Sequence, residues 1–163
     1  MLTSDGLTRA QFMPLWRDAM TTAVDPGERC RLVLEMGRVG AKEVGHSEPM
    51  LIAITEGRGQ PLTVLPLLEL PSMTAAPEVR EGVQQRLAEL GATEVYVLAT
   101  LRGPNDAMLL ASWGETASGE ERCQLLAYRK RGERIEEAQP LVAPDPSLTE
   151  ISRQCRGLLP QRH

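Results

Sequence analysis

The sequence predicts an α+β domain whose centre is a mainly antiparallel sheet of five or six strands. Four short β-type runs occupy residues 93–101, 107–113, 122–129 and 133–142. Short connections rich in glycine and polar residues separate these runs. Such connections are too short to join parallel strands, so the runs are expected to form an antiparallel meander. Two earlier runs, 50–56 and 62–70, predict a hairpin that completes the sheet.

A first helix is expected near the N-terminus. Apolar residues recur at three- and four-residue steps from Phe12 to Ala23, which is typical of one buried helix face. Proline fits the first turn of a helix and disrupts later turns. Thr8 and Gln11 could form a capping box, but Pro14 places the start near residues 10–13, and residues 1–9 are expected to fray.

A second helix begins with Asp25 as the N-cap and Pro26 at the first helical position. Gly37, Gly40 and Gly45 predict that this helix ends in the glycine-rich stretch and passes into a loop at residues 44–49. The same stretch invites interpretation as a phosphate-binding loop. A Walker loop needs Gly-Lys-Ser/Thr between a strand and a helix, whereas glutamate follows Lys42 here. Helix termination is therefore the favoured interpretation.

Proline and glycine mark the elements that follow the first β-type run. Pro61 and Pro66 predict that the run at 62–70 is an edge strand or carries a bulge. Residues 77–90 have a helical apolar stripe and a proline in the first turn, and Gly91 suits a left-handed C-terminal cap.

The last hairpin and the last helix are predicted from turn and capping residues. A three-residue loop with Gly132 in the left-handed conformation would set Arg129 opposite Glu133, which places opposite charges together. A capping box that begins at Ser147 predicts a C-terminal amphipathic helix. Residues 160–163 are expected to fray.

The resulting order of elements is α, α, β, β, α, β, β, β, β, α. This order is similar to that of profilin-like and roadblock-type domains, in which one antiparallel sheet of five or six strands carries helices. The resemblance rests on element order and on no motif. It therefore implies a fold and carries little information about function.

Length and composition predict one soluble domain spanning residues 1–163. A chain of 163 residues is long enough to bury a core without disulfides or metals. Its charged fraction of 25% and apolar fraction of 42% are ordinary for a soluble protein. A net charge of -4 gives no overall attraction to phosphate backbones or anionic lipid. Nucleic-acid partners are thus disfavoured, and no membrane partner is expected.

The three cysteines, Cys30, Cys123 and Cys155, are far apart and form no C-x-x-C pair. This pattern fits buried thiols in a reducing compartment better than disulfides or a zinc site. The first residues lack a basic segment and an apolar segment, and no run approaches the ~18 apolar residues of a membrane span. A cytoplasmic protein without cofactor or metal is expected.

The most reactive stretch in the sequence is a loop in which His46 lies between Glu43 and Glu48. An imidazole beside a carboxylate can act as a base or a metal ligand. A single histidine without further ligands is more often a solvated loop residue, so this interpretation is favoured.

Two other stretches are candidates for binding. Trp113 and Glu115 stand at the end of a strand, where the indole either faces a partner or closes the core, and the two interpretations are equally weighted. Basic residues gather around one hairpin, at Arg122, Arg129 and positions 130, 131 and 134, but glutamates are interleaved with them. A solvated hairpin with cross-strand ion pairs is therefore favoured over a phosphate-binding tip.

Three functional hypotheses follow from these patterns. The leading one is a non-catalytic interaction or regulatory module, with a homo-oligomer and another protein as possible partners. It self-associates as a homodimer through a sheet edge or a helix pair. The alternative is a small-ligand-binding or sensor domain with a pocket between sheet and helices, where Arg58 or His46 recognises an anion. The third is an enzyme that uses the His46 loop. The candidate binding residues are Glu43, His46, Glu48, Arg58, Trp113 and Glu115.

Overall fold

The structure is a computed structural model that describes residues 1–55, 61–66, 77–102, 108–131, 134–137 and 146–159. Its helices are α1 (Arg9–Thr22), α2 (Pro26–Val44), α4 (Pro77–Leu90) and α5 (Pro146–Cys155). Its strands are β1 (Met50–Thr55), β2 (Leu62–Pro66), β3 (Ala92–Arg102), β4 (Met108–Thr116), β5 (Glu121–Arg131) and β6 (Arg134–Glu137). The last four residues of the predicted run at 62–70 and the predicted frayed end at 160–163 lie outside the described residues.

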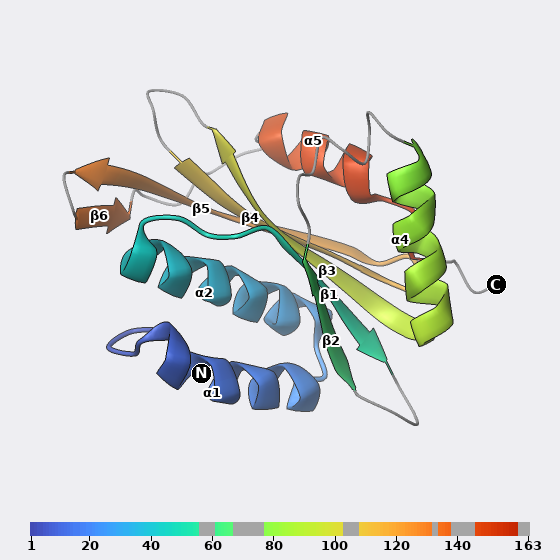
Figure 1. Cartoon of the computed structure of the whole chain (residues 1–163), viewed down its shortest axis with the longest axis horizontal. Helices are drawn as coiled ribbons and strands as arrows, with labels where there is room; N and C mark the ends of the chain where they lie inside the picture. Colours follow the sequence, from blue (N-terminus) through green and yellow to red (C-terminus); the bar gives the residue numbers. More distant parts are fainter. Residues whose placement is uncertain (56–60, 67–76, 103–107, 132–133, 138–145, 160–163) are drawn as a thin grey trace.

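The strands form one six-stranded sheet in the order β2-β1-β3-β4-β5-β6, in which every neighbouring pair is antiparallel (Figure 1). The β1–β2 hairpin and the β3–β6 meander are both confirmed. Because β2 and β3 are each antiparallel to β1, they run parallel to each other. A parallel connection needs a long crossover, and the segment that contains α4 supplies it.

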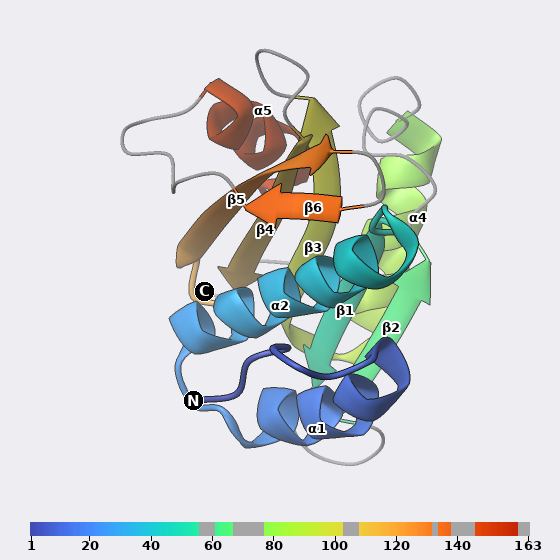
Figure 2. The same ribbon diagram turned by 90° about the vertical axis from the view of Figure 1, so that its left-hand side faces the viewer.

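Helices cover both faces of this sheet. Figures 1 and 2 show α1 and α2 on one side of the strands and α4 and α5 on the other. Side chains alternate along a strand, so β3 serves both layers: Val95 and Val97 join the α4/α5 core, and Tyr96 and Leu98 join the α1/α2 core. The sheet is therefore the shared wall of two apolar layers.

Helix α1 begins earlier than Pro14 suggests. The Thr8 hydroxyl accepts a hydrogen bond from the Gln11 backbone N–H, and the Gln11 side chain accepts one from the Thr8 N–H, which is a complete capping box. Glu43 also accepts the N–H of Arg9 at 2.6 Å. The predicted start at 10–13 is wrong, because these caps stabilise a helix that contains Pro14 past its first turn.

Helix α2 begins at Asp25 and Pro26 as predicted and ends at Val44, where the predicted loop begins. It continues through Gly37 and Gly40 to a left-handed cap at Gly45, where φ is 82°. A Cβ on Gly37 would lie 2.8 Å from Leu98 Cδ1. The glycine therefore permits close packing of the helix on β3, and the helix passes through it before it ends at Val44.

The last hairpin has a tighter register than predicted. Arg131 pairs with Arg134, and Arg129 pairs with Glu136 rather than with Glu133. The strands extend further toward the turn than their charged residues suggest. The register sets Arg131 and Arg134, two residues of like charge, opposite each other, so charge pairing did not decide the register and the prediction made from it is wrong.

Candidate functional site

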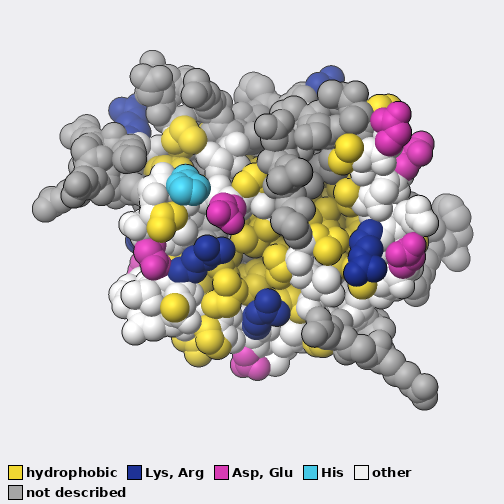
Figure 3. Space-filling view, viewed as in Figure 1, with side chains coloured by type: hydrophobic (Ala, Val, Ile, Leu, Met, Phe, Trp, Pro, Cys, Tyr) yellow, Lys and Arg dark blue, Asp and Glu magenta, His cyan; other side chains and the backbone are white. Residues whose placement is uncertain are grey.

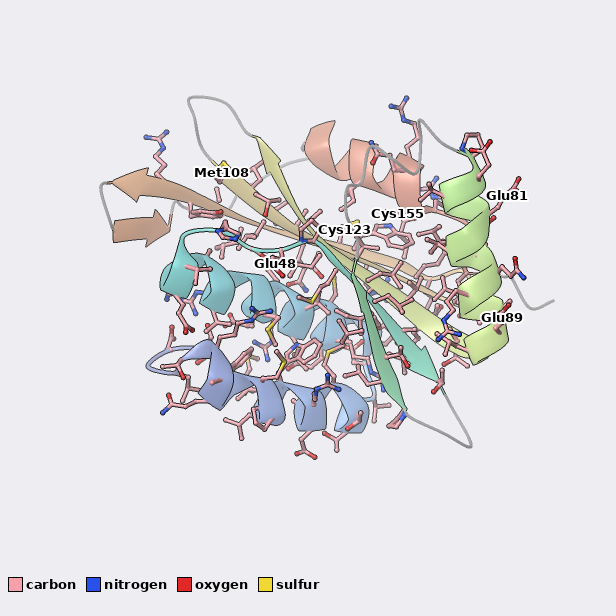
Figure 4. All side chains as sticks on the ribbon, viewed as in Figure 1. Glu48, Glu81, Glu89, Met108, Cys123 and Cys155 are labelled. Carbon is pink, nitrogen blue, oxygen red and sulfur yellow. The ribbon has the colours of Figure 1, made fainter. Side chains whose placement is uncertain are left out.

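The histidine loop between α2 and β1 is exposed, and one of its two flanking carboxylates is engaged elsewhere in the fold. Glu43, His46 and Glu48 are all exposed, and Figure 4 labels Glu48 near this loop. The Glu43 carboxylate is used at the N-terminus of α1, where it accepts the Arg9 N–H at 2.6 Å. Carboxylates stabilise that end of a helix because its backbone N–H groups are unpaired. Arg58 lies outside the described residues.

Trp113 and Glu115 lie on β4 and face the α4/α5 layer. Trp113 is fully buried and belongs to the apolar core of that layer. Glu115 is 3% exposed. The structure therefore supports the interpretation in which the Trp113 indole closes the core over the one in which it faces a partner. Neither the Trp113 nor the Glu115 side chain forms part of the described surface.

Glu115 holds the turn that follows α5. Its Oε2 accepts a hydrogen bond from the Gly157 N–H at 3.2 Å, where Gly157 is left-handed with φ of 86°. Its Oε1 and the Trp113 Nε1 have no hydrogen-bond partner among the described residues. Burial raises the pKa of the Glu115 carboxyl group, and the backbone N–H of Gly157 partly opposes this effect.

Glu121 pairs with Glu115 across β4 and β5 but has a different environment. Arg156 donates to both of its oxygens, from Nε at 2.9 Å and from a terminal nitrogen at 3.2 Å, and the Ser152 hydroxyl donates at 2.6 Å. The Arg156 hydrogen bonds lower the pKa of Glu121. Two facing carboxyl groups thus have pKa values shifted in opposite directions, and both contact the C-terminal end of α5.

Helix α4 also holds the C-terminal end of α5. Arg80 donates to the backbone carbonyls of Gln154 and Arg156, and the Gln84 side chain donates to the carbonyl of Gly157 at 2.9 Å. These are carbonyl groups at a helix end, which a cation stabilises. We call Arg80, Gln84, Glu115 and Glu121 the α5 anchor. Among the described residues, these hydrogen bonds account for every carboxylate oxygen of the α5 anchor except Glu115 Oε1.

The thiols beside the α5 anchor are protonated at neutral pH. Burial raises the pKa of Cys123 and of Cys155 to about 12, and Figure 4 shows both between the strands and α5. A thiol is a nucleophile only as the thiolate, so these two groups are chemically inert in the folded chain. Within the described ranges, no three His, Cys, Asp or Glu residues are grouped to hold a metal ion. Among the described helices, none is both long and apolar enough to cross a membrane.

The outer edge of β2 is the remaining candidate. Strand β2 is at one end of the sheet and pairs with β1 only, as far as the described strands show. Beside it is a shallow depression of about 390 Å³ lined by Arg17, Asp18, Thr21, Pro61 and Leu62. Figure 3 shows apolar side chains gathered in the middle of the face that includes α1, with charged side chains around them. This edge combines backbone groups, apolar side chains and both signs of charge.

Comparison of the chain with known protein families, with curated proteins and with solved structures finds no match in any of the three. The geometry is therefore the basis for any functional inference.

The sequence reasoning missed the α5 anchor apart from Glu115. Arg80, Gln84 and Arg156 come from elements far apart in the chain, and no local pattern joins them. One signal was present. Two strands joined by a turn through Gly119 place Glu115 opposite Glu121, and facing carboxylates need a cation or a proton.

Proposed function

We infer that the protein is a non-catalytic interaction or regulatory module that self-associates as a homodimer. The observation that carries this inference is the outer edge of β2, which continues the sheet of the core and has no described strand beside it. Unpaired strand edges are the usual place where sheets accept a further strand. The similarity of the element order to profilin-like and roadblock-type domains is part of the proposal and rests on order alone.

The environments of the reactive side chains support a non-catalytic function. Glu43 caps α1, Glu115 and Glu121 hold the turn after α5, and the neighbouring thiols are protonated. A catalytic group must approach a substrate and exchange a proton or a bond with it. Each of the three carboxylates instead accepts hydrogen bonds from the backbone or from an arginine of its own chain.

A second candidate function is binding of a small ligand. The depression beside α1 and β2 favours it, since its volume of about 390 Å³ would accommodate a small molecule. It is open rather than enclosed, and Arg17 and Asp18 present both charges to it. Self-association remains the preferred proposal because an open surface with mixed charge resembles a protein interface more than a ligand pocket.

Native mass spectrometry combined with light scattering tests both functions. The expected result is a dimer whose fraction grows between about 1 and about 200 μM protein, a range that covers micromolar dissociation constants. A monomer at every concentration would reject self-association. A monomer with a reproducible small adduct would favour ligand binding instead.

A further inference from the structure

We propose that two copies of the chain pair through the outer edges of their β2 strands, antiparallel about a two-fold axis, so that two six-stranded sheets become continuous. This inference rests on the proposed self-association and names the surface responsible for it.

The hydrogen bonds between β1 and β2 determine which backbone groups of β2 point outward. The Thr55 N–H donates to the Pro61 carbonyl at 3.0 Å, and the two strands pair from there without a shift. Hydrogen-bonded pairs alternate along an antiparallel ladder. Residues 61, 63 and 65 therefore bond to β1, whereas residues 62, 64 and 66 direct their backbone groups to the outer edge.

The outward N–H and carbonyl groups of β2 can form hydrogen bonds with the same groups of a second copy whose β2 runs in the opposite direction. With the two-fold axis at Thr63, Leu62 of each copy exchanges two hydrogen bonds with Val64 of the other. With the axis at Val64, the two Val64 residues exchange two bonds, and each Leu62 N–H meets a Pro66 carbonyl. Both registers supply four backbone hydrogen bonds from the described residues alone, which is the self-complementarity that a two-fold interface requires.

The neighbouring surface of α1 suits a second copy as well. The two-fold axis is perpendicular to the sheet and therefore does not exchange its two faces. The α1 helices of both copies thus lie on the same face of the joined sheet, beside the β2 edges. Arg17 and Asp18 are adjacent in the depression at this edge, so each copy offers both a cation and an anion to its partner. Leu15 is 48% exposed one turn before Asp18 on the same helix. Mixed charge around an apolar side chain is typical of a protein interface.

Proline limits the length of this pairing. Pro66 lacks an N–H, and proline at a strand edge prevents an extended ladder from growing. A strand of five residues with a proline at its end accepts a short partner and leaves no long edge for aggregation. The expected complex is thus a closed dimer of modest affinity rather than a fibre.

Amide hydrogen exchange of the unmodified chain tests the proposal with an internal control. The amides of Leu62 and Val64 should exchange at least about threefold more slowly at about 200 μM protein than at about 1 μM, because among the described residues they gain backbone partners only in the dimer. The amides of Thr63 and Leu65 bond to β1 in both states and should be protected at both concentrations.

Cysteine substitutions distinguish the two registers. Thr63→Cys should form an intermolecular disulfide if the axis is at Thr63, and Val64→Cys if it is at Val64, since both facing positions have Cα separations that a disulfide spans. Pairing gives these thiols an effective concentration near millimolar, so cross-linking in glutathione buffer should be at least about tenfold faster than for Val79→Cys on α4. The parent chain, with its native cysteines, gives the background rate.

The outcomes separate this inference from the proposed function. Concentration-dependent protection of Leu62 and Val64 with cross-linking of one edge variant supports β2 pairing. A dimer in which these amides exchange equally at both concentrations and neither edge variant cross-links overturns β2 pairing but leaves self-association. A monomer at every concentration overturns both.

Discussion

Glu115 and Glu121 face each other on neighbouring strands, but the protein favours a different protonation state for each. Burial raises the pKa of Glu115 from its ordinary value of 4.5, so folding favours the protonated acid. The guanidinium of Arg156 lowers the pKa of Glu121 from the same value, so folding favours the carboxylate. One proton near a pair of facing carboxyl groups removes the repulsion that two charges would cause.

Glutamine at these two positions should have opposite effects on the pH dependence of stability. The contribution of Glu115 is fully present below pH 4.5 and declines as the pH rises through its raised pKa, so Glu115→Gln should gain stability relative to the parent as the pH rises toward 7.5. The contribution of Glu121 is present above pH 4.5 and is lost as the pH falls through its lowered pKa. Glu121→Gln should therefore lower the free energy of unfolding most at neutral pH.

Urea unfolding of both variants between about pH 2.5 and pH 7.5 measures these slopes, because the Glu121 contribution changes only below pH 4.5. Each variant is the control for the other, because the two side chains share a cross-strand pair. Parallel slopes would contradict the opposite directions of the two pKa shifts.

Gly114 lies opposite Tyr96, and the tyrosine ring occupies the space that a side chain would need. A Cβ at this position would lie 2.5 Å from the Tyr96 ring, whereas a Cβ on Gly82 in α4 would have no atom within 4 Å. Gly114→Ala should reduce the free energy of unfolding by about 1–3 kcal/mol through overpacking. Gly82→Ala should raise it by about 0.5–1 kcal/mol, because alanine favours a helix interior. Equal effects in urea unfolding would show that the ring moves aside at little cost.

Capping and turn residues in the sequence correctly predicted the elements whose ends are determined by residues nearby in the chain. Helix α4 runs from Pro77 to Leu90 as predicted, and Gly91 is left-handed with φ of 68°. The start of α1 differs from the prediction because a local capping box of Thr8 and Gln11 outweighs Pro14, and distant contacts support both this start and the passage of α2 through Gly37. Glu43 supports the start of α1, and Leu98 needs the space beside Gly37. Sequence spacing contains no information about such partners.

Helix α5 depends on Arg80 for its attachment to α4. The guanidinium donates to two backbone carbonyls at the end of α5, those of Gln154 and Arg156. Arg80→Ala should lower the free energy of unfolding by about 1–3 kcal/mol, the range for hydrogen bonds made by a charged group. It should also accelerate amide exchange in residues 151–158 more than elsewhere.

Arg86→Ala is the matched control on the same helix. Arg86 is half exposed and lies 3.7 Å from Glu89, so its removal should change stability by less than about 0.5 kcal/mol. If both arginine variants behave alike, the α5 anchor does not hold the helix.

The candidate site was less predictable than the fold because its parts meet only in three dimensions. The antiparallel sheet follows from short connections and alternating side chains, which are local properties. The position of β2 at the sheet edge was indicated by Pro61 and Pro66 and is confirmed. Its neighbours Arg17 and Asp18 come from α1, and only folding brings them beside Leu62. The edge was thus foreseeable, and the surface around it was not.

The two tryptophans report separately on the two layers of the molecule. Trp16 lies in the α1/α2 layer, where its Nε1 donates to the Leu32 carbonyl at 2.9 Å, and Trp113 lies in the α4/α5 layer. Strands β1 and β3 contribute side chains to both layers, so neither layer can lose its packing while the other keeps it. We therefore expect cooperative unfolding of the whole described domain.

Single-tryptophan variants test this cooperativity. Trp16→Phe leaves only the indole of Trp113, and Trp113→Phe leaves only that of Trp16. Within each variant, the urea midpoint from tryptophan fluorescence should equal the midpoint from far-ultraviolet circular dichroism, because one transition removes both layers. Protein concentration must be equal in both measurements, since a dimer makes the midpoint depend on concentration. A fluorescence midpoint below the circular dichroism midpoint in one variant alone would show that its layer opens first, and that the shared strands do not couple the two cores.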